Sequence, residues 1–349
     1  MFRKKKYCLL LLLTIFVLLY IIVTTDLYEL LMVPRISSAS VEILCYDEPT
    51  DLNNSALLLL DERLVAKNNS IFFVETSCNN GNLLLNPRQA CALESAAKLN
   101  PGHMVYLLVA SPIKNNFFQE HINRLSVYKN IKLRHVDMNT YFDNTPLKKF
   151  YRKKTLKSSL WPQSHASDIL RYATLWKFGG IYLDLDVVLL KPFNNLINFA
   201  GAENDYDIAA GVLSFSYKHA VANMSIEDVK YNFKGWLWGN NGPGVITRSL
   251  QKYCQVNEVS KMTVEQCNGF RIFPPSAFYP IPWRKWKDYF TKNESEIERV
   301  MTTLNDSIAI HVWNFHSKAL NITVGSKQPY AILASRFCPE VYSSLNDIF

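Results

Sequence analysis

Residues 167–186 constrain the fold more than any other part of this sequence, because they combine a helix pattern, a short apolar run and two aspartates. Residues 167–178 have apolar side chains at helical spacing, and a glycine pair ends that pattern. The apolar residues 181–183 then suit a buried strand. Since side chains alternate along an extended backbone, Asp184 and Asp186 project on the same side. The stretch therefore predicts a helix leading into an interior strand that ends in paired carboxylates.

Other apolar runs extend this alternation of strands and helices. They predict buried strands at 71–74, 105–110 and 131–136, and a helix follows the first of them at 91–99. Nearly half of the 349 residues are hydrophobic and 13% are aromatic, which is enough for a large core. We therefore expect an α/β fold, with a mostly parallel, Rossmann-like sheet flanked by helices and a ligand at the carboxyl ends of its strands.

The N-terminus has the pattern of a transmembrane signal anchor. Residues 1–6 are basic, and a nearly unbroken apolar run at 7–25 is about long enough to span a bilayer. The positive-inside rule then keeps the basic tail in the cytosol and places the rest in the lumen, which is a type II topology. The alternative is a cleaved signal peptide, which leads to the same compartment. We expect a stem at 26–68 and a lumenal domain at 69–349.

Two further features indicate a lumenal chain. N-x-S/T sequons, which mark glycosylation sites in secreted proteins, begin at Asn53, Asn68, Asn223, Asn293, Asn305 and Asn321. Six cysteines lie outside the apolar segment, an even set that suits an oxidising compartment, although buried free thiols are the alternative. Fifteen pairings exist for six cysteines. Short loops favour Cys78 with Cys91 and Cys254 with Cys267, which leaves Cys45 with Cys338.

The aspartate pair suggests a metal site. Mg²⁺ and Mn²⁺ prefer carboxylate oxygens, and a cation held by Asp184 and Asp186 is able to bridge the two phosphates of a sugar nucleotide. Asp168 and Arg171 are three residues apart on the preceding helix and share a face, so both can point toward the same cleft. A polar strand end and an i,i+3 ion pair are the structural alternatives.

The formal net charge of +8 does not indicate a nucleic-acid partner. Part of it comes from the N-terminal tail and part from a basic segment at 148–157, with no aromatic-interleaved basic stripe and no recognised nucleic-acid-binding module. We interpret the basic segment as a solvated surface. Contact with anionic lipid headgroups or with a UDP diphosphate is the alternative.

Several segments together resemble one enzyme family. The run SDILRYATLWKFGGIYLDLD at 167–186 is similar to the donor-site signature of the α-1,4-galactosyltransferase and α-1,4-N-acetylglucosaminyltransferase family, the globotriaosylceramide synthase type. Further segments that match the family are IFFVETSC at 71–78, ESAA at 94–97, GWLWGNNGPGVITR at 235–248, PPSAFYPIPW at 274–283 and AIHVWN at 309–314. The resemblance spans about residues 70 to 340.

This resemblance implies a GT-A glycosyltransferase fold, a UDP-sugar donor, dependence on Mn²⁺ or Mg²⁺, and retention of the anomeric configuration. It implies a membrane-anchored Golgi enzyme that transfers galactose, or an N-acetylhexosamine, in α-1,4 linkage to a glycosphingolipid or another glycan. Attack from the same face and double displacement through a protein carboxylate are both open as mechanisms. A homodimer is a candidate assembly, and a catalytically silent glycan-binding protein is the alternative function.

The resemblance also implies roles for the site residues. Asp186 would ligate the metal directly, and Asp184 would contact the ribose or a metal-bound water. Asp168 and Arg171 would hold the donor sugar. His311 would be a further metal or diphosphate ligand, or else a buried core histidine. The remaining donor-binding residues are expected to be Glu75, Thr76 and Ser77 near the uridine, together with Tyr172 and Trp313.

A tryptophan-containing segment is the candidate acceptor site. Trp236 and Trp238 alternate along the chain, and aromatic faces stack well against the C–H surface of sugars, although both residues could instead belong to the core. The glycines that follow permit close approach of a ligand to the backbone. Asn241, where some related sequences have glutamine, is the third expected acceptor contact.

Overall fold

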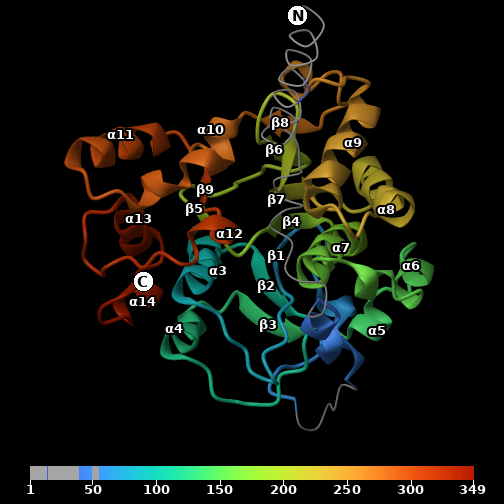
Figure 1. The fold of residues 1–349 in the computed structure, drawn as a ribbon, viewed down its shortest axis with the longest axis horizontal. Helices are drawn as coiled ribbons and strands as arrows, with labels where there is room; N and C mark the ends of the chain where they lie inside the picture. The colour runs from blue at the N-terminus through green and yellow to red at the C-terminus, as the bar shows by residue number, and fades with distance from the viewer. Residues whose placement is uncertain (1–13, 15–38, 49–54) are drawn as a thin grey trace, which may run out of the picture.

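The computed structural model describes residue 14 and residues 39–48 and 55–349 (Figure 1). The expected cytosolic tail, the membrane segment at 7–25 apart from residue 14, and the sequon at Asn53 lie outside these residues. Within the part of the chain that is described, no helix has the length and apolar character needed to cross a bilayer.

A mixed seven-stranded sheet forms the centre of the molecule (Figure 1). In spatial order its strands are β3 (Ile131–His135), β2 (Met104–Val109), β1 (Ser70–Glu75), β4 (Gly180–Leu183), β7 (Ile208–Phe215), β6 (Phe199–Ala202) and β8 (Arg271–Phe273). In this sheet β7 alone runs against the other strands. The predicted mostly parallel sheet is therefore confirmed, and β6, β7 and β8 are strands that the sequence patterns did not predict. A separate two-stranded ribbon pairs β5 (Val187–Leu189) with β9 (Ala309–His311).

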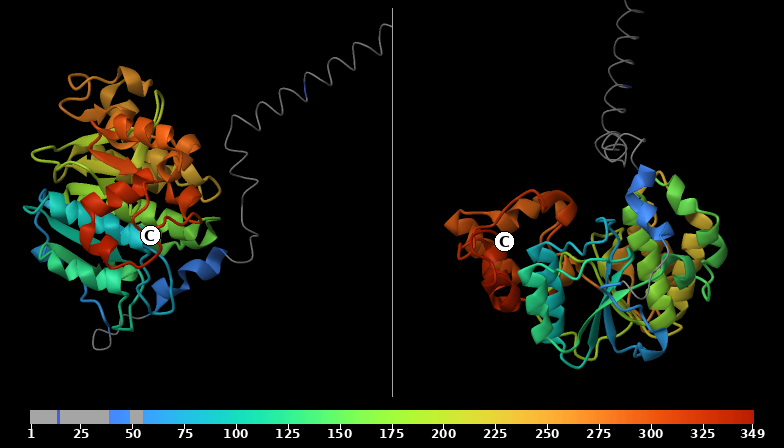
Figure 2. Two further views of the ribbon diagram at one scale, coloured as in Figure 1. Left: turned by 90° about the vertical axis from the view of Figure 1, so that its left-hand side faces the viewer. Right: turned by 90° about the horizontal axis from the view of Figure 1, so that it is seen from below.

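Helices cover both faces of the sheet (Figure 2). Along β1, Ile71 and Phe73 pack into one core while Phe72 and Val74 pack into the other, so the strand is buried on both faces. The first face carries α3 (Pro87–Leu99), α4 (Glu120–Asn123), α13 (Pro329–Phe337) and α14 (Pro339–Ser343). The second carries α5 (Met138–Tyr141), α6 (Lys148–Arg152), α7 (Pro162–Phe178), α8 (Ala220–Asn232) and α9 (Pro243–Cys254).

Shorter helices complete the architecture. In the described part of the chain, the remaining α-helices are α10 (Pro275–Phe278), α11 (Glu294–Leu304) and α12 (Asn314–Ser317). The 3₁₀ helices are η1 (Ala39–Asp47), η2 (Glu62–Leu64), η3 (Arg124–Val127), η4 (Thr155–Ser158), η5 (Trp238–Asn240), η6 (Val259–Lys261) and η7 (Trp283–Phe290). Two long helices begin earlier than predicted. Proline occupies the first turn of both α3 and α7, where its missing N–H costs nothing, and an Asn86–Gln89 capping box fixes the start of α3.

The glycine pair between α7 and β4 is required by geometry. The Gly179 N–H donates to the Leu175 carbonyl over 2.8 Å and ends α7. Gly180 has φ +88°, and a Cβ there would lie 2.4 Å from the Ser70 carbonyl oxygen on β1. Only glycine therefore lets β4 enter the sheet beside β1 at this point.

Three disulfides join the described cysteines: Cys45–Cys78, Cys91–Cys338 and Cys254–Cys267. The predicted Cys254–Cys267 pair is confirmed, but the predicted Cys78–Cys91 and Cys45–Cys338 pairs are wrong. Cys91 and Cys338 are buried in the core on one face of the sheet, whereas Cys45 and Cys78 pack against the core on the other face. The sheet thus separates the partners that short loop length favoured.

Residues that we expected in a stem lie against the sheet. The Leu60 N–H donates to the His135 carbonyl over 2.8 Å, and the Ala56 N–H donates to the Ile113 carbonyl over 2.7 Å. The Asn68 N–H donates to the Phe178 carbonyl at the end of α7. Residues 55–68 therefore follow the β3 edge and then cross to α7.

Glu94, in the ESAA segment, has a structural position. Its buried carboxylate accepts hydrogen bonds from the backbone N–H groups of Glu340 (2.9 Å) and Val341 (2.8 Å) and from the Tyr128 hydroxyl (2.8 Å). Burial raises the pKa of Glu94 and these hydrogen bonds oppose that shift. The side chain therefore caps the start of α14 and fixes the C-terminal helices on α3.

Candidate active site

Asp184 and Asp186 lie in the turn that joins β4 to β5, at the carboxyl end of β4. The Asp184 N–H donates to the Gly211 carbonyl on β7, and the Val187 N–H donates to the Asp184 carbonyl, both over 2.9 Å. The Asp184 side chain is 25% exposed and that of Asp186 is 15% exposed. Both carboxylates are thus partly buried and still reachable from solvent.

The β5–β9 ribbon brings His311 to the aspartate pair. Val187 is the register partner of His311, so the imidazole lies across the ribbon from the turn. Its Nε2 is 3.2 Å from Asp186 Oδ1 and 3.7 Å from Asp184 Oδ2. One ligand atom from each of the three residues lies within 4.8 Å of the others. Residue spacing gives no sign of this closeness, because 125 residues separate Asp186 from His311, and only the family resemblance pointed to His311 as a ligand.

The electrostatics of this cluster favour a cation. Burial raises the pKa of Asp186 more than His311 lowers it, while Arg171 and His311 lower the pKa of Asp184 against the effect of burial. Burial alone would lower the pKa of His311, but the carboxylates of Asp186 and Asp184 raise it. Two carboxylates and one imidazole form a donor set that fits Mn²⁺ and related divalent ions.

Gly211 on β7 closes one side of the cluster. A Cβ at this position would lie 3.0 Å from both Asp184 Oδ2 and His311 Cδ2. A larger residue would therefore press on two of the three candidate ligands. The signal in the sequence is a glycine within a strand, which often marks a close approach of another group.

Arg171 links α7 to the aspartate turn. Its Nη2 is 3.0 Å from Asp168 Oδ1, so the i,i+3 ion pair is present, and its Nη1 is 3.2 Å from Asp184 Oδ1. Nη1 also donates to the Ala210 carbonyl over 2.9 Å. Tyr182 supports the same arrangement, because its hydroxyl donates to Asp184 Oδ1 over 2.7 Å and its ring lies 4.7 Å from the guanidinium carbon. Asp168 and Arg171 therefore belong to one charge network with Asp184.

The start of α9 lies against Asp168. The Tyr172 hydroxyl donates to the Gly242 carbonyl over 2.6 Å, and a Cβ on Gly242 would lie 2.4 Å from Asp168 Oδ1. Asn241 is buried, and its amide accepts from the Lys234 N–H (2.9 Å) and donates to the Lys234 carbonyl (2.9 Å). Its Nδ2 is also 3.0 Å from His165 Nε2.

Comparison with known proteins identifies the family. The chain is 34% identical over 304 residues to lactosylceramide 4-alpha-galactosyltransferase of Mus musculus, covering 86% of this chain and 82% of that protein. It is 34% identical to the Homo sapiens protein of the same name over 281 residues, 79% of this chain and 77% of the other. Residues 214–345 match the alpha 1,4-glycosyltransferase conserved region, and residues 86–202 match the glycosyltransferase sugar-binding region containing the DXD motif. The chain belongs to the alpha 1,4-glycosyltransferase family.

More distant similarities extend to a further curated protein and to solved structures. The glycosyltransferase is 28% identical over 292 residues to alpha-1,4-N-acetylglucosaminyltransferase of Homo sapiens, covering 81% of this chain and 83% of that one. Among solved structures, the PaToxG glycosyltransferase aligns with a TM-score of 0.42 and 17% identity, covering 59% of this chain and 84% of the other. Galactosyltransferase LgtC in complex with donor and acceptor sugar analogues aligns at 0.36 and 14%, covering 79% and 96%. Family membership makes this chain a hexosyltransferase, and Asp184 and Asp186 are the aspartates of its DXD motif.

The residues expected near the uridine lie at the carboxyl end of β1, where Glu75 is the last residue of the strand and Thr76 and Ser77 follow it. Glu75 Oε1 accepts from the Ser77 N–H (2.7 Å) and from the Ser77 hydroxyl (2.5 Å), and burial raises the pKa of Glu75 despite these bonds. The Thr76 hydroxyl donates to the Gln163 carbonyl over 3.1 Å. Because β1 and β4 are parallel neighbours, residues 75–77 lie at the same end of the sheet as the DXD motif, where both strands have their carboxyl ends.

The tryptophans of the glycosyltransferase occupy different environments. Trp313 has its ring 4.3 Å from that of His311, and its Nε1 donates to the Ile281 carbonyl over 2.8 Å. Trp236 is 57% exposed, and Trp238 is partly exposed. Neither Trp236 nor Trp238 is a fully buried core residue.

His165 is a residue that the sequence patterns missed. It is buried near the start of α7, with Nδ1 2.6 Å from the Ser159 hydroxyl and Nε2 3.3 Å from the Trp238 carbonyl. Burial lowers its pKa to about 4, so the imidazole is neutral at pH 7. Its contact with Asn241 shows that it connects α7 to the tryptophan-containing segment.

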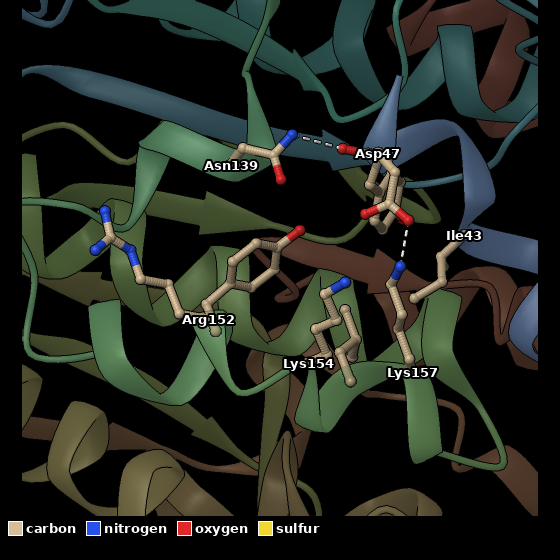
Figure 3. Close-up of a pocket in the computed structure, with 9 residues that line it drawn as sticks. Ile43, Asp47, Asn139, Arg152, Lys154 and Lys157 are labelled. Atoms are coloured by element: carbon tan, nitrogen blue, oxygen red, sulfur yellow. Dashed lines mark hydrogen bonds and ion pairs between the residues drawn. The ribbon is translucent and has the colours of Figure 1, made fainter. Parts of the chain in front are cut away.

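Two hollows of the glycosyltransferase lie away from the DXD motif. One, of about 280 Å³, lies between η1 and the basic segment and is lined by Arg152, Lys154 and Lys157 (Figure 3). Asp47 pairs with Lys157 at its edge. The other, of about 600 Å³, lies at the β2–β3 edge beside residues 57–60. Neither is lined by a residue of the candidate active site.

Proposed function

We propose that this glycosyltransferase moves galactose, or an N-acetylhexosamine, from a UDP-sugar in α-1,4 linkage to the glycan of a glycosphingolipid, with retention of the anomeric configuration. The names of the curated relatives support the linkage and the acceptor class. The observation that carries the proposal is the convergence of Asp184, Asp186 and His311 at the carboxyl end of β4. We further propose that the fold is GT-A.

The same three side chains are the proposed ligands of a divalent cation, Mn²⁺ or Mg²⁺. Two partly buried carboxylates and one imidazole within 4.8 Å of one another are a suitable donor set. When bound, the cation supplies positive charge that offsets the charge of the departing diphosphate. The Asn314 N–H, which donates to Asp186 Oδ2 over 2.7 Å, orients the carboxylate.

The residues around the proposed cation site bind the other parts of the donor. Arg171 and Asp168 bind and orient the donor sugar, and Arg171 adds a fixed positive charge that does not need to reorganise during the reaction. Glu75, Thr76 and Ser77 bind the nucleoside at the neighbouring strand end.

Two aromatic residues and one amide form the proposed acceptor side of the site. Trp236 and Trp238 supply aromatic surface to the acceptor. Asn241, whose amide is committed to the Lys234 backbone and His165, holds this segment in place.

The membrane topology is proposed on sequence grounds. A type II chain with its catalytic domain in the Golgi lumen agrees with the basic tail, the apolar segment and the sequons. The sequon asparagines at 68, 223, 293, 305 and 321 are all exposed. Digestion of the expressed chain with an N-glycosidase, together with protease protection of microsomes, tests this topology.

Replacement of a proposed metal ligand tests the function. In the full-length chain in detergent, Asp186→Asn is expected to lower UDP release from the best UDP-sugar by at least about 100-fold, because charge stabilisation of several kcal/mol is removed. The assay compares UDP-galactose, UDP-GalNAc and UDP-GlcNAc, with glycolipid and free-glycan acceptors and with added Mn²⁺ or Mg²⁺.

The matched control is Asp143→Asn, which neutralises an aspartate that pairs with Arg152 at the surface. This variant is expected to keep full activity. Turnover of Asp186→Asn at the level of the control would refute the metal assignment, and absence of transfer by the unmodified chain with every donor would refute the function.

A further inference from the structure

Three segments that resemble the family meet at α12. The sequence did not indicate that they contact one another. Trp238 belongs to the segment 235–248, Trp283 ends the segment 274–283, and Phe315 directly follows the segment 309–314. The ring centroids of Trp238 and Phe315 are 5.7 Å apart, with a tilt of 37°. Those of Phe315 and His316 are 5.1 Å apart, edge to face. The rings of His316 and Trp283 are stacked at 5.4 Å with 14° between their planes. The four rings thus form a continuous aromatic row.

The aromatic row is fixed to the candidate active site through the backbone of α12. Asn314 is the first residue of α12, and its N–H donates to Asp186 Oδ2 over 2.7 Å. At the other end, Arg88 Nη1 donates to the Ser317 carbonyl over 3.0 Å. Phe315 therefore lies one residue from a backbone group that contacts the DXD motif, on a helix held at both ends.

The four rings differ in what they can offer a ligand. Trp283 has His316 stacked on its ring and the Arg284 guanidinium carbon 5.0 Å from its centroid. His316 is partly buried between Trp283 and Phe315, and burial lowers its pKa, so it adds no charge to the row at pH 7. Phe315, by contrast, is 62% exposed, and Trp238 beside it is partly exposed. An exposed aromatic surface beside a polar site is more informative than a scattered apolar residue.

We propose that Phe315 and Trp238 form a platform on which a sugar ring of the acceptor glycan stacks, and that the His316–Trp283 stack positions α12 beneath it. This inference rests on the proposed function and specifies its acceptor side. The apolar C–H face of a pyranose suits an aromatic surface, and the hydroxyl groups at its edge remain free for polar contacts.

Substitution of Phe315 tests the platform, with Phe315→Leu and Phe315→Trp as the informative pair. Leucine keeps apolar volume but removes the aromatic face, whereas tryptophan keeps an aromatic face. We expect Phe315→Leu to raise the KM for lactose and N-acetyllactosamine glycosides about fivefold, as loss of an aromatic stacking contact implies. The KM for the UDP-sugar and the rate of UDP-sugar hydrolysis without acceptor should stay unchanged. Phe315→Trp should keep the acceptor KM within about twofold of the unmodified value.

Tyr231→Leu is the matched control, because Tyr231 is an exposed aromatic residue on α8 whose ring contacts Lys230. Its acceptor KM should equal that of the unmodified chain. If Phe315→Leu and Phe315→Trp show the same acceptor KM, the platform is wrong while the function stands. If the unmodified chain transfers no sugar, the proposed function fails first. In that case saturation-transfer NMR with lactose on the unmodified chain and on Phe315→Leu still decides the platform, and equal signals from both would overturn it.

Discussion

Asp168 is the buried carboxylate on which the charge network of the site depends. Burial raises its pKa to about 7 from an ordinary value of 3.8, Arg171 opposes that shift, and the negative charge of Asp184 adds to it. The ion pair with Arg171 is therefore not enough to compensate for the loss of water around the carboxylate. The protonation state of Asp168 consequently changes near neutral pH.

The raised pKa of Asp168 predicts a specific pH dependence of stability. Because the folded-state pKa lies above the unfolded-state value, the stabilisation is fully present below about pH 4 and is lost as pH rises to about 7. We expect Asp168→Asn to remove this part of the decline in the free energy of unfolding between pH 5 and pH 8. Urea denaturation of both proteins at the two pH values measures the effect, and parallel declines would contradict the assignment.

Individual site residues differ in how far the sequence could place them. Asp184 and Asp186 follow an apolar run, so their position at a strand end is readable from the pattern. Their approach to His311 depends on the β5–β9 pairing of two three-residue strands, too short to give a periodic signal. Asn241 stays a predicted acceptor contact, and its amide also bonds the Lys234 backbone, a local partner that no residue pattern reveals.

The contact between α7 and α9 shows how two elements build one side of the site. The start of α9 is held by the Tyr172 hydroxyl, and Gly242 lies so close to Asp168 that no side chain fits between them. The pattern of apolar residues predicted α7. It could not predict the spacing between α7 and α9, because that spacing depends on Gly242. The same limit applies to β6, β7 and β8, which lie beyond β4 and were not predicted.

Adding a methyl group at Gly242 tests this packing. Gly242→Ala would place a Cβ 2.4 Å from Asp168 Oδ1, so the start of α9 must shift, and we expect a loss of about 1–3 kcal/mol in unfolding free energy. Gly239→Ala is the matched control, since its nearest neighbour would be an ordinary 3.8 Å away. Thermal unfolding and UDP release of both variants give the comparison. Equal behaviour of the two variants would show that the close approach is not needed.

The molecule as a whole is closed by a long-range disulfide. Cys91 on α3 joins Cys338 between α13 and α14, with a sequence separation of 247, whereas Cys254 and Cys267 are separated by 13. The even number of cysteines correctly indicated disulfide bonds. Loop length ranked two of the three pairs wrongly, because the sheet places Cys78 and Cys91 on opposite faces. The overall sheet with helices on both faces was predictable because its parallel half consists of long apolar runs.

Loop length does predict the relative stabilisation by these disulfides. The chain-entropy relation gives Cys91–Cys338 about 2–3 kcal/mol more than Cys254–Cys267. We therefore expect the double variant Cys91→Ser/Cys338→Ser to unfold at a lower urea concentration than Cys254→Ser/Cys267→Ser. Peptide mapping under non-reducing conditions checks the pairs themselves. An equal loss in both double variants would mean that the long bridge does not restrict the unfolded chain as expected.

The Cys91–Cys338 bridge also sets an order of events during synthesis. The thiol of Cys91 leaves the ribosome long before its partner, while Cys78, which is nearer in the chain, is already present. Cys45 emerges before Cys78, so an early bond between these two removes the nearest competitor. A nascent chain that forms this bond first keeps the thiol of Cys91 for the last helices, whereas a chain that first joins Cys78 to Cys91 must exchange that bond before Cys91 can pair with Cys338.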